Sequence, residues 1–280
     1  MRLGGTVAGN YKTPQEWEQI LVRTGFRAVT APFSAETPRD VVREYCAIAK
    51  KHDVVIAEVG VWRNLFDPNP AAAAKAMAYA MAQLKLADEC GIPCCVNIAG
   101  TAGDAGWDGA DPSNYTQEAY DRIVVSIREL LDAVKPKRAY YCLEPMPWMV
   151  PDGPDEYLQL IRDVDRPMFG AHMDFVNMIN SPRRHLCADE FVEECFAKLG
   201  PYIKSTHIKD SHMDRMKLTT VLTECSPGEG ELDYGAILRS IHRHLPPDAP
   251  VLLEHMNTFE EYRAAFEYVA AAAAEEGIGI

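Results

Sequence analysis

Short apolar runs alternate with longer helical patterns along almost the whole chain, and this alternation constrains the fold more than any other feature. We count about eight strand–helix units of roughly 35 residues each. Strands that are apolar on both faces and alternate with helices are typical of a parallel sheet covered by helices. Because eight such units close into a barrel of roughly 250 residues, the sequence predicts a (β/α)₈ TIM barrel, with residues 1–280 as a single domain.

Capping residues and glycines suggest where the helices begin and end. Thr13–Pro14 and Thr37–Pro38 each place a hydroxyl N-cap before a proline at the first helical position. Gly25 ends the first helix, and Thr258 with Glu261 forms a capping box for the last. Loops are expected before the helices at "DEFVEECFAKLG" and "DYGAILRSIHRHL". The expected strands are "RLGGTV", "RAVTAPF", "VVIAEVGV", "PCCVNIAG", "RAYYCLEP", "FGAHMDF", "IKSTHIKD" and "APVLLEHM".

An open, doubly wound sheet is the main alternative to a barrel. Such sheets usually carry a GxGxxG turn after the first strand, whereas this chain has "GGTVAGN" there. No linker or low-complexity segment divides the sequence. These observations favour the barrel.

The charge and composition of the chain limit its partners. The formal net charge is −13, so the surface repels phosphate backbones and anionic membranes. No apolar run reaches the ~20 residues of a membrane-spanning helix, and "MRLGGTVAGNYKTP" lacks the apolar core of a signal peptide. The eight cysteines contain no CxxC pair. We therefore expect a cytoplasmic protein that binds neither nucleic acid nor membranes.

Four consecutive predicted strands deliver a side chain that can bind a metal. Glu144, Asp174 and Glu254 end the fifth, sixth and eighth strands, and the seventh carries His207. In such a barrel the active site forms at the C-terminal ends of the strands, where a lone charge in an apolar run is costly. A shared divalent cation removes that cost. Separate strand-end salt bridges, such as Asp174 with Lys209, are the alternative.

Three carboxylates and one imidazole make a ligand set that is rich in oxygen. Such a set suits Mn²⁺, Mg²⁺ or Co²⁺ better than it suits a thiolate-seeking metal. We therefore expect one divalent metal ion, with Mn²⁺ as the first candidate and Mg²⁺, Co²⁺ or Zn²⁺ as the others.

The segments "LEP", "HMDFVN", "STHIKD", "PGEGELDY" and "LLEHM" together resemble the xylose-isomerase-like TIM barrels, the sugar phosphate isomerase/epimerase superfamily. The resemblance covers nearly the whole chain. It implies that one divalent metal is bound by Glu144, Asp174, His207 and Glu254. In the ketose 3-epimerase branch the two glutamates also move the proton, one on each face of the substrate, which implies Glu144 and Glu254 as the catalytic acid/base pair.

The expected activity is that of a metal-dependent sugar isomerase or epimerase. A carboxylate removes the proton next to a carbonyl, and a metal acting as a Lewis acid stabilises the resulting enediolate. Return of the proton to the other face gives epimerisation, and its return to the neighbouring carbon gives isomerisation. Loss of a β-leaving group instead gives elimination. The ligand set alone does not choose among these outcomes.

Other positions depart from the ketose 3-epimerase pattern. Asn177, Met213 and Val150 stand where those enzymes carry a His, an Arg and a sugar-binding Glu. The segments "PMPWMVPDGPDEY", "HMDFVNMINSPRR" and "LEHMNTFEEY" instead resemble the catalytic subunits that cleave C-glycosides. That branch implies a metal-dependent lyase that cleaves 3-oxo-glycosides by β-elimination. Inosose dehydratases, which dehydrate keto-cyclitols, are a further lyase relative with the same opening step.

Several side chains are candidates for contact with a carbohydrate substrate. His172 and Lys209 each lie two residues from a predicted ligand and share its face of the strand, although a satisfied core histidine and a strand-end ion pair are ordinary roles for them. Trp148 could stack on a sugar ring or pack under a loop. The substrate-binding candidates are His172, Lys209, Asn177, Arg215 and Trp148. Further candidates for the pocket wall are Glu58, Asn97, Trp62 and Trp107.

The sequence has no obvious basic clamp for phosphate, which favours a substrate without phosphate. We expect a homo-oligomer, or a hetero-oligomer with a small β-rich subunit if the lyase interpretation holds. A DNA-repair endonuclease of the same architecture would need more histidine ligands and a basic face. A non-catalytic barrel used in assembly would not need an intact ligand set. The acidic charge and the four ligands argue against these two classes.

Overall fold

Eight parallel strands close into a barrel in the computed structural model, which describes residues 1–280. The strands pair in the order β1-β10-β7-β6-β5-β4-β3-β2, and the ring closes between β1 and β2. This confirms the prediction of a (β/α)₈ TIM barrel. The barrel strands are β1 (Arg2–Gly5), β2 (Ala28–Thr30), β3 (Val55–Gly60), β4 (Cys94–Asn97), β5 (Tyr140–Leu143), β6 (Phe169–Asp174), β7 (Ile203–Ile208) and β10 (Pro250–Leu253).

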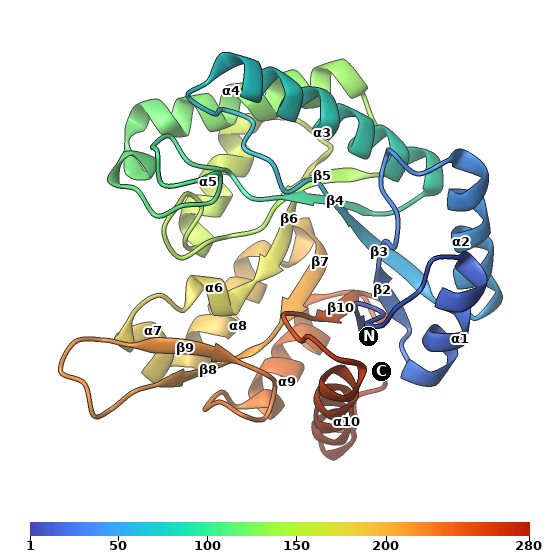
Figure 1. Cartoon of the computed structure of the whole chain (residues 1–280). Helices are drawn as coiled ribbons and strands as arrows, with labels where there is room; N and C mark the ends of the chain where they lie inside the picture. The colour runs from blue at the N-terminus through green and yellow to red at the C-terminus, as the bar shows by residue number, and fades with distance from the viewer.

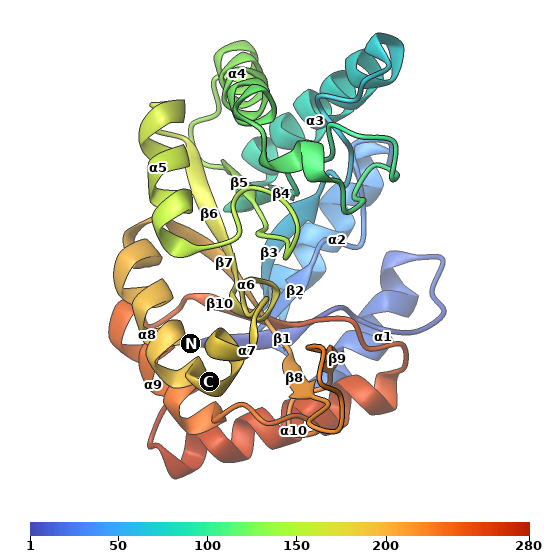
Figure 2. The same ribbon diagram turned by 90° about the vertical axis from the view of Figure 1, so that its left-hand side faces the viewer.

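Helices surround the barrel on the outside, as Figures 1 and 2 show from two directions. A connected hydrophobic cluster of 70 buried residues joins these helices to the strands, so the barrel and its helices share one core. The amino group of Met1 donates to the carbonyl of Gly279 at 2.8 Å, which brings the two termini together beside β1. The main helices are α1 (Pro14–Thr24), α2 (Arg39–Lys51), α3 (Pro70–Cys90), α4 (Gln117–Val134), α5 (Pro154–Val164), α8 (Ala188–Leu199), α9 (Tyr234–His244) and α10 (Phe259–Glu275).

Most of the predicted helix caps are confirmed. Capping boxes start α1 at Thr13 and α10 at Thr258, and Gly25 ends α1 with a left-handed φ of 74°. The prediction of a Thr37 cap is wrong, because α2 begins at Arg39 after Pro38 and has no side-chain cap. The Thr37 hydroxyl instead accepts a hydrogen bond from a backbone N–H three residues earlier, which uses it in the preceding turn.

Two segments expected to be loops contain further structure. The short helices α6 (Phe175–Met178) and α7 (Pro182–Leu186) follow β6. An antiparallel hairpin of β8 (Asp210–Met213) and β9 (Leu222–Cys225) follows β7 and projects from the barrel in Figure 1. Asp210 fixes the return of the hairpin, because its carboxylate accepts hydrogen bonds from the backbone N–H groups of Gly228, Gly230 and Leu232. Short 3₁₀ turns occupy η1 (Pro112–Tyr115) and η2 (Gly200–Tyr202).

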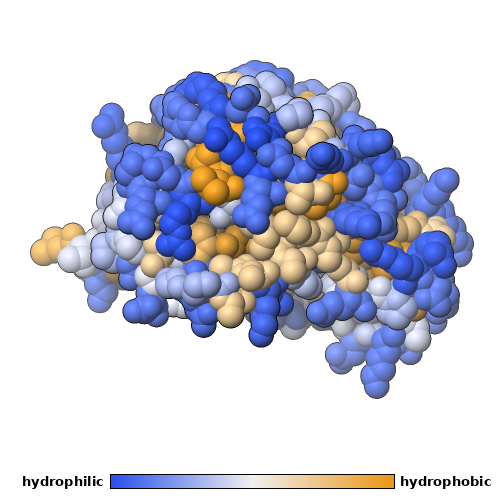
Figure 3. Space-filling model, turned by 90° about the horizontal axis from the view of Figure 1, so that it is seen from above, coloured by the Kyte–Doolittle hydropathy of each residue, from blue (hydrophilic) through white to orange (hydrophobic).

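The face of the molecule seen in Figure 3 is mainly hydrophilic around its edge, and apolar residues form a band across its middle. The most exposed large apolar side chains are Met216 and Leu218, in the turn between β8 and β9. None of the helices combines the length and the apolar character that crossing a membrane requires.

Candidate metal centre and its cavity

The four predicted metal ligands meet at the C-terminal ends of β5, β6, β7 and β10. We call this set the ligand quartet: Glu144, Asp174, His207 and Glu254. One ligand atom from each lies within 4.8 Å of the others. The parallel register of β6 on β7 places Asp174 directly beside His207. Ligands on opposite sides of one hard divalent cation are about 4–5 Å apart, so the spacing suits a single ion.

The hydrogen bonding of the quartet is incomplete in a way that fits a metal. Glu144 Oε2, Asp174 Oδ2 and His207 Nδ1 are buried and have no hydrogen-bond partner. Asp174 Oδ2 lies 2.7 Å from Lys209 Nζ, and His207 Nδ1 lies 3.0 Å from Glu254 Oε1, but neither contact has the alignment of a hydrogen bond. Unpartnered buried polar atoms are costly. A divalent ion between them would satisfy all three, so these residues fit the implied metal.

The charges of the quartet attract positive charge to its centre. Burial alone would lower the pKa of His207, but the nearby carboxylates, Glu254 foremost, raise it well above its usual value. Burial raises the pKa of Asp174 to about 7; Lys209 opposes this shift, while Glu144 and Glu254 add to it. In the absence of an ion, the quartet therefore holds protons where a cation would otherwise bind.

We expect the affinity of the quartet for Mn²⁺ to fall as the pH drops below about 7, where Asp174 takes up a proton. The ion binds the ionised carboxylate, so competition lowers the apparent affinity about tenfold per pH unit below that pKa. His207 must also lose its proton and makes the dependence steeper. Calorimetric titrations across this range measure the effect. An affinity that stays constant below pH 7 contradicts the role of Asp174 as a ligand.

Lys209 is enclosed beside the quartet and does not line the cavity. Its side chain is 1% exposed, and Nζ lies 2.7 Å from both Asp174 Oδ2 and Glu254 Oε2. It also lies 3.2 Å from Glu224 Oε2. The ion pair of Asp174 with Lys209 was expected as the alternative to a metal site. It therefore forms alongside the clustered quartet rather than instead of it. One ammonium group cannot neutralise all these carboxylates, so the pair does not remove the need for another cation.

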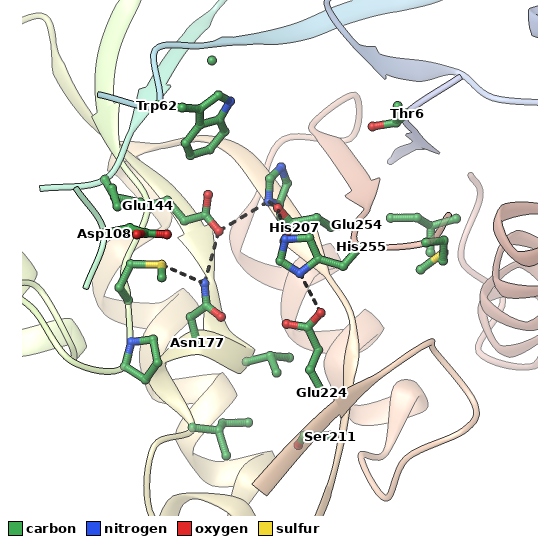
Figure 4. A pocket seen from close by; sticks show the side chains of 18 of the residues that line it. Thr6, Trp62, Asp108, Glu144, Asn177, His207, Ser211, Glu224, Glu254 and His255 are labelled. Carbon is green, nitrogen blue, oxygen red and sulfur yellow. Dashed lines mark hydrogen bonds and ion pairs between the residues drawn. The ribbon is translucent and has the colours of Figure 1, made fainter. Parts of the chain in front are cut away.

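A large cavity opens above the quartet. It has a volume of about 1300 Å³, and Glu144, His207 and Glu254 line it. In Figure 4, Trp62 lies on one side of these ligands, and Asn177 lies on the other. None of the lining residues is a lysine or an arginine. The cavity is larger than the ~300–1,000 Å³ of most small-ligand pockets. Its lining offers no permanent positive charge to an anionic substrate.

A family model described as "Xylose isomerase-like TIM barrel" matches residues 19–272. The chain belongs to this family. A comparison with curated proteins finds no match.

Solved structures share the fold of this xylose isomerase-like barrel. A xylose isomerase-like TIM barrel protein from Mycobacterium smegmatis in complex with magnesium is 17% identical, with a TM-score of 0.69 over 95% of this chain and 90% of that one. D-psicose 3-epimerase from Clostridium cellulolyticum H10, with D-tagatose, is 14% identical, with a TM-score of 0.71 over 97% and 99%. The 3-keto-D-glucoside 4-epimerase from E. coli is 13% identical, with a TM-score of 0.69 over 97% and 99%. At these identities the likeness shows the fold alone.

Two of the five predicted substrate-binding residues line the cavity of the xylose isomerase-like barrel. Asn177 donates from Nδ2 to Glu144 Oε1 at 3.2 Å, and its backbone N–H donates to Asp174 Oδ1 at 2.9 Å. Trp148 lies at the rim, where its indole N–H donates to the carbonyl of Asp108 at 2.8 Å. Asn177 therefore contacts two residues of the quartet and also lines the cavity.

The other predicted substrate-binding residues lie outside the cavity lining. His172 is fully buried, with Nε2 3.1 Å from Glu58 Oε2. Arg215 lies in the turn of the β8–β9 hairpin, where its exposed guanidinium is 3.3 Å from Glu231 Oε1. Asn97, a weaker candidate, is also fully buried and bonds the backbone of the β3–α3 connection. His172 was predicted from its spacing to Asp174, but that spacing does not bring its side chain to the cavity wall.

His255 and Glu224, two residues of the cavity wall that contact each other, were not predicted from the sequence. His255 Nδ1 lies 2.6 Å from Glu224 Oε1, and its Nε2 lies 3.3 Å from Glu254 Oε1. The hydrogen bond that His255 donates to Glu224 raises the pKa of His255. His255 follows a predicted ligand directly, which is a signal that the sequence contains. Glu224 had no such signal, because the hairpin that carries it over the cavity was expected to be a loop (Figure 4).

Proposed function

We propose that this xylose isomerase-like barrel is a divalent-metal-dependent sugar isomerase or epimerase that abstracts a proton next to a carbonyl. The observation that carries the proposal is the quartet, whose unpartnered oxygen and nitrogen atoms converge beneath a large cavity. The epimerases among the similar structures support a carbohydrate as the substrate class. A bound divalent ion, with Mn²⁺ as the first candidate, would stabilise as a Lewis acid the negative charge that develops on the substrate oxygens.

Glu144 and Glu254 are the residues to which we assign proton transfer. They approach His207 from different strands, with Oε1 atoms 3.7 Å and 3.0 Å from its Nδ1. Burial would raise the pKa of Glu254, but His207 and Lys209 outweigh burial and hold it well below its usual value. Glu254 is therefore ionised, which is the state that a proton acceptor needs. A substrate held between the two glutamates can lose a proton to one and regain it from the other.

A lyase that cleaves 3-oxo-glycosides or dehydrates keto-cyclitols by β-elimination is the second candidate, and the cavity favours it. Trp62, Trp107 and Trp148 line a volume that extends well beyond the quartet. Aromatic faces stack on sugar rings and on aromatic aglycones, and the absence of lysine and arginine disfavours a phosphate group. Elimination begins with the same proton abstraction, so Glu144 and Glu254 keep their roles.

Incubation with Mn²⁺ in D₂O tests the proposal and separates its two forms. The substrates are a panel of free ketoses and a panel of 3-oxo-glycosides. Deuterium in recovered or epimerised sugar supports an isomerase or epimerase, whereas a released aglycone or an unsaturated product supports a lyase. A preparation stripped of metal serves as the control. Loss of both signals across the panels with every candidate metal contradicts the proposed function.

A further inference from the structure

A second group of polar side chains lies beneath the quartet, inside the barrel. Its centre is Glu58 of β3, which is 3% exposed. Glu58 Oε2 accepts a hydrogen bond from Ser205 Oγ at 2.6 Å and lies 3.1 Å from His172 Nε2. Glu58 Oε1 lies 2.9 Å from His207 Nε2. The carboxylate therefore joins the quartet, through His207, to side chains on β3, β6 and β7.

This contact determines which nitrogen of His207 is available to a metal. Both oxygens of Glu58 face side chains that can donate: Ser205 Oγ and His172 Nε2 meet Oε2, and His207 Nε2 meets Oε1. An ionised carboxylate only accepts hydrogen bonds, so His207 Nε2 must carry a proton. When an ion binds, the proton that the ring gives up is then the one on Nδ1, which faces the quartet and has no hydrogen-bond partner.

We infer that Glu58 is the positioning residue of the metal centre: it holds the ring of His207 with Nδ1 toward the ion. The inference rests on the proposed metal site and adds a residue that does not touch the ion. Carboxylate partners of metal-binding histidines fix the ring and increase its basicity, and their loss typically weakens metal binding 10–100-fold. Ser205 and His172 in turn keep Glu58 in place.

A second metal ion is the competing interpretation of this cluster. Glu58, His172 and His207 offer ligand atoms within 4.8 Å of one another. However, both oxygens of Glu58 are already paired with donors of the protein at 2.6–3.1 Å. A second ion could approach from the cavity, which Glu58 and His207 line, but it would have to displace those contacts. We therefore expect one ion for each chain.

The test measures Mn²⁺ binding by calorimetry, together with the visible spectrum of the Co²⁺ form, in the wild type and in Glu58→Gln. Glutamine keeps the size of the side chain, but its amide cannot accept from both imidazoles. We expect Kd for Mn²⁺ to rise about 10–100-fold, one ion per chain, and a shifted Co²⁺ spectrum. Ser205→Ala, which removes one donor to Glu58, should raise Kd by a smaller factor. If Glu58→Gln does not fold, Ser205→Ala decides the test by the same readouts.

Thr206→Val is the matched control, because Thr206 is a fully buried neighbour on β7 whose hydroxyl has no partner. It should bind Mn²⁺ as the wild type does. Wild-type Kd and an unchanged Co²⁺ spectrum in Glu58→Gln overturn the positioning role alone, as do two ions per chain in the wild type. Failure of the wild type itself to bind any divalent ion overturns the proposed function as well.

Discussion

Glu144→Gln and Glu254→Gln should each lower turnover at least about 1,000-fold while the barrel remains folded. A positioned acid or base contributes about 10²–10⁴-fold to proton transfer, and an amide neither accepts a proton nor offers the ion a negative charge. Both residues follow the last residue of a barrel strand, so the substitution leaves the strand itself intact. Steady-state rates on the substrate that the D₂O panel identifies measure the effect, and circular dichroism checks the fold.

Glu229→Gln is the matched control for these two variants. Glu229 is an exposed glutamate in the loop after β9, and it does not line the cavity. Its turnover should equal that of the wild type. Near-wild-type turnover in Glu144→Gln or Glu254→Gln contradicts the role assigned to that residue. The melting curve of each variant distinguishes a loss of turnover caused by unfolding from one caused by loss of the carboxylate.

Removal of divalent metal by a chelator should abolish turnover and lower the melting temperature. A ligand present at about 1,000 times its Kd stabilises the folded state by about 4 kcal/mol. With an unfolding entropy of about 2.1 cal/mol/K per residue, that free energy corresponds to about 7 °C for a chain of 280 residues. Thermal unfolding with and without saturating Mn²⁺ measures the shift, and added Mn²⁺ should restore both turnover and stability.

Asp174→Asn provides the control for metal removal. Asp174 is fully buried in the quartet, and an amide is a weaker ligand for a hard cation than a carboxylate. We expect the melting temperature of this variant to respond much less to Mn²⁺. An equal response in Asp174→Asn and the wild type would show that the stabilising ion binds outside the quartet.

The barrel could be predicted because its information is local and repeated. Each strand is a short apolar run, and each helix has its own cap or stop, as Thr13, Gly25 and Thr258 illustrate. The error at Thr37 has the same local origin, because a hydroxyl beside a proline can cap a helix or close a turn. In the structure the Thr37 hydroxyl accepts a hydrogen bond in the turn before α2. The β8–β9 hairpin escaped prediction because its strands are only four residues long and mostly polar.

The quartet could be predicted for a different reason. Parallel strands of a closed barrel bring their C-terminal ends to one rim, so polar residues at the ends of β5, β6, β7 and β10 must lie near one another. Knowing the strand ends was enough to group these ligands. The same rule does not say which way a neighbouring long side chain turns. Lys209 was expected at the substrate, yet it turns toward Asp174 and Glu254.

The amino-acid order alone was sufficient for the barrel, the rim and the convergence of the four quartet residues, because periodic burial and strand direction specify them. The contacts that complete the centre join residues far apart in the chain. Glu58 meets His207 across 149 positions, and Glu224 meets His255 through a hairpin that folds back over the cavity. Such pairs depend on strand register and on backbone curvature. Register and curvature are set only by the packing of the whole barrel. The residue pairs that depend on them therefore leave no pattern along the sequence.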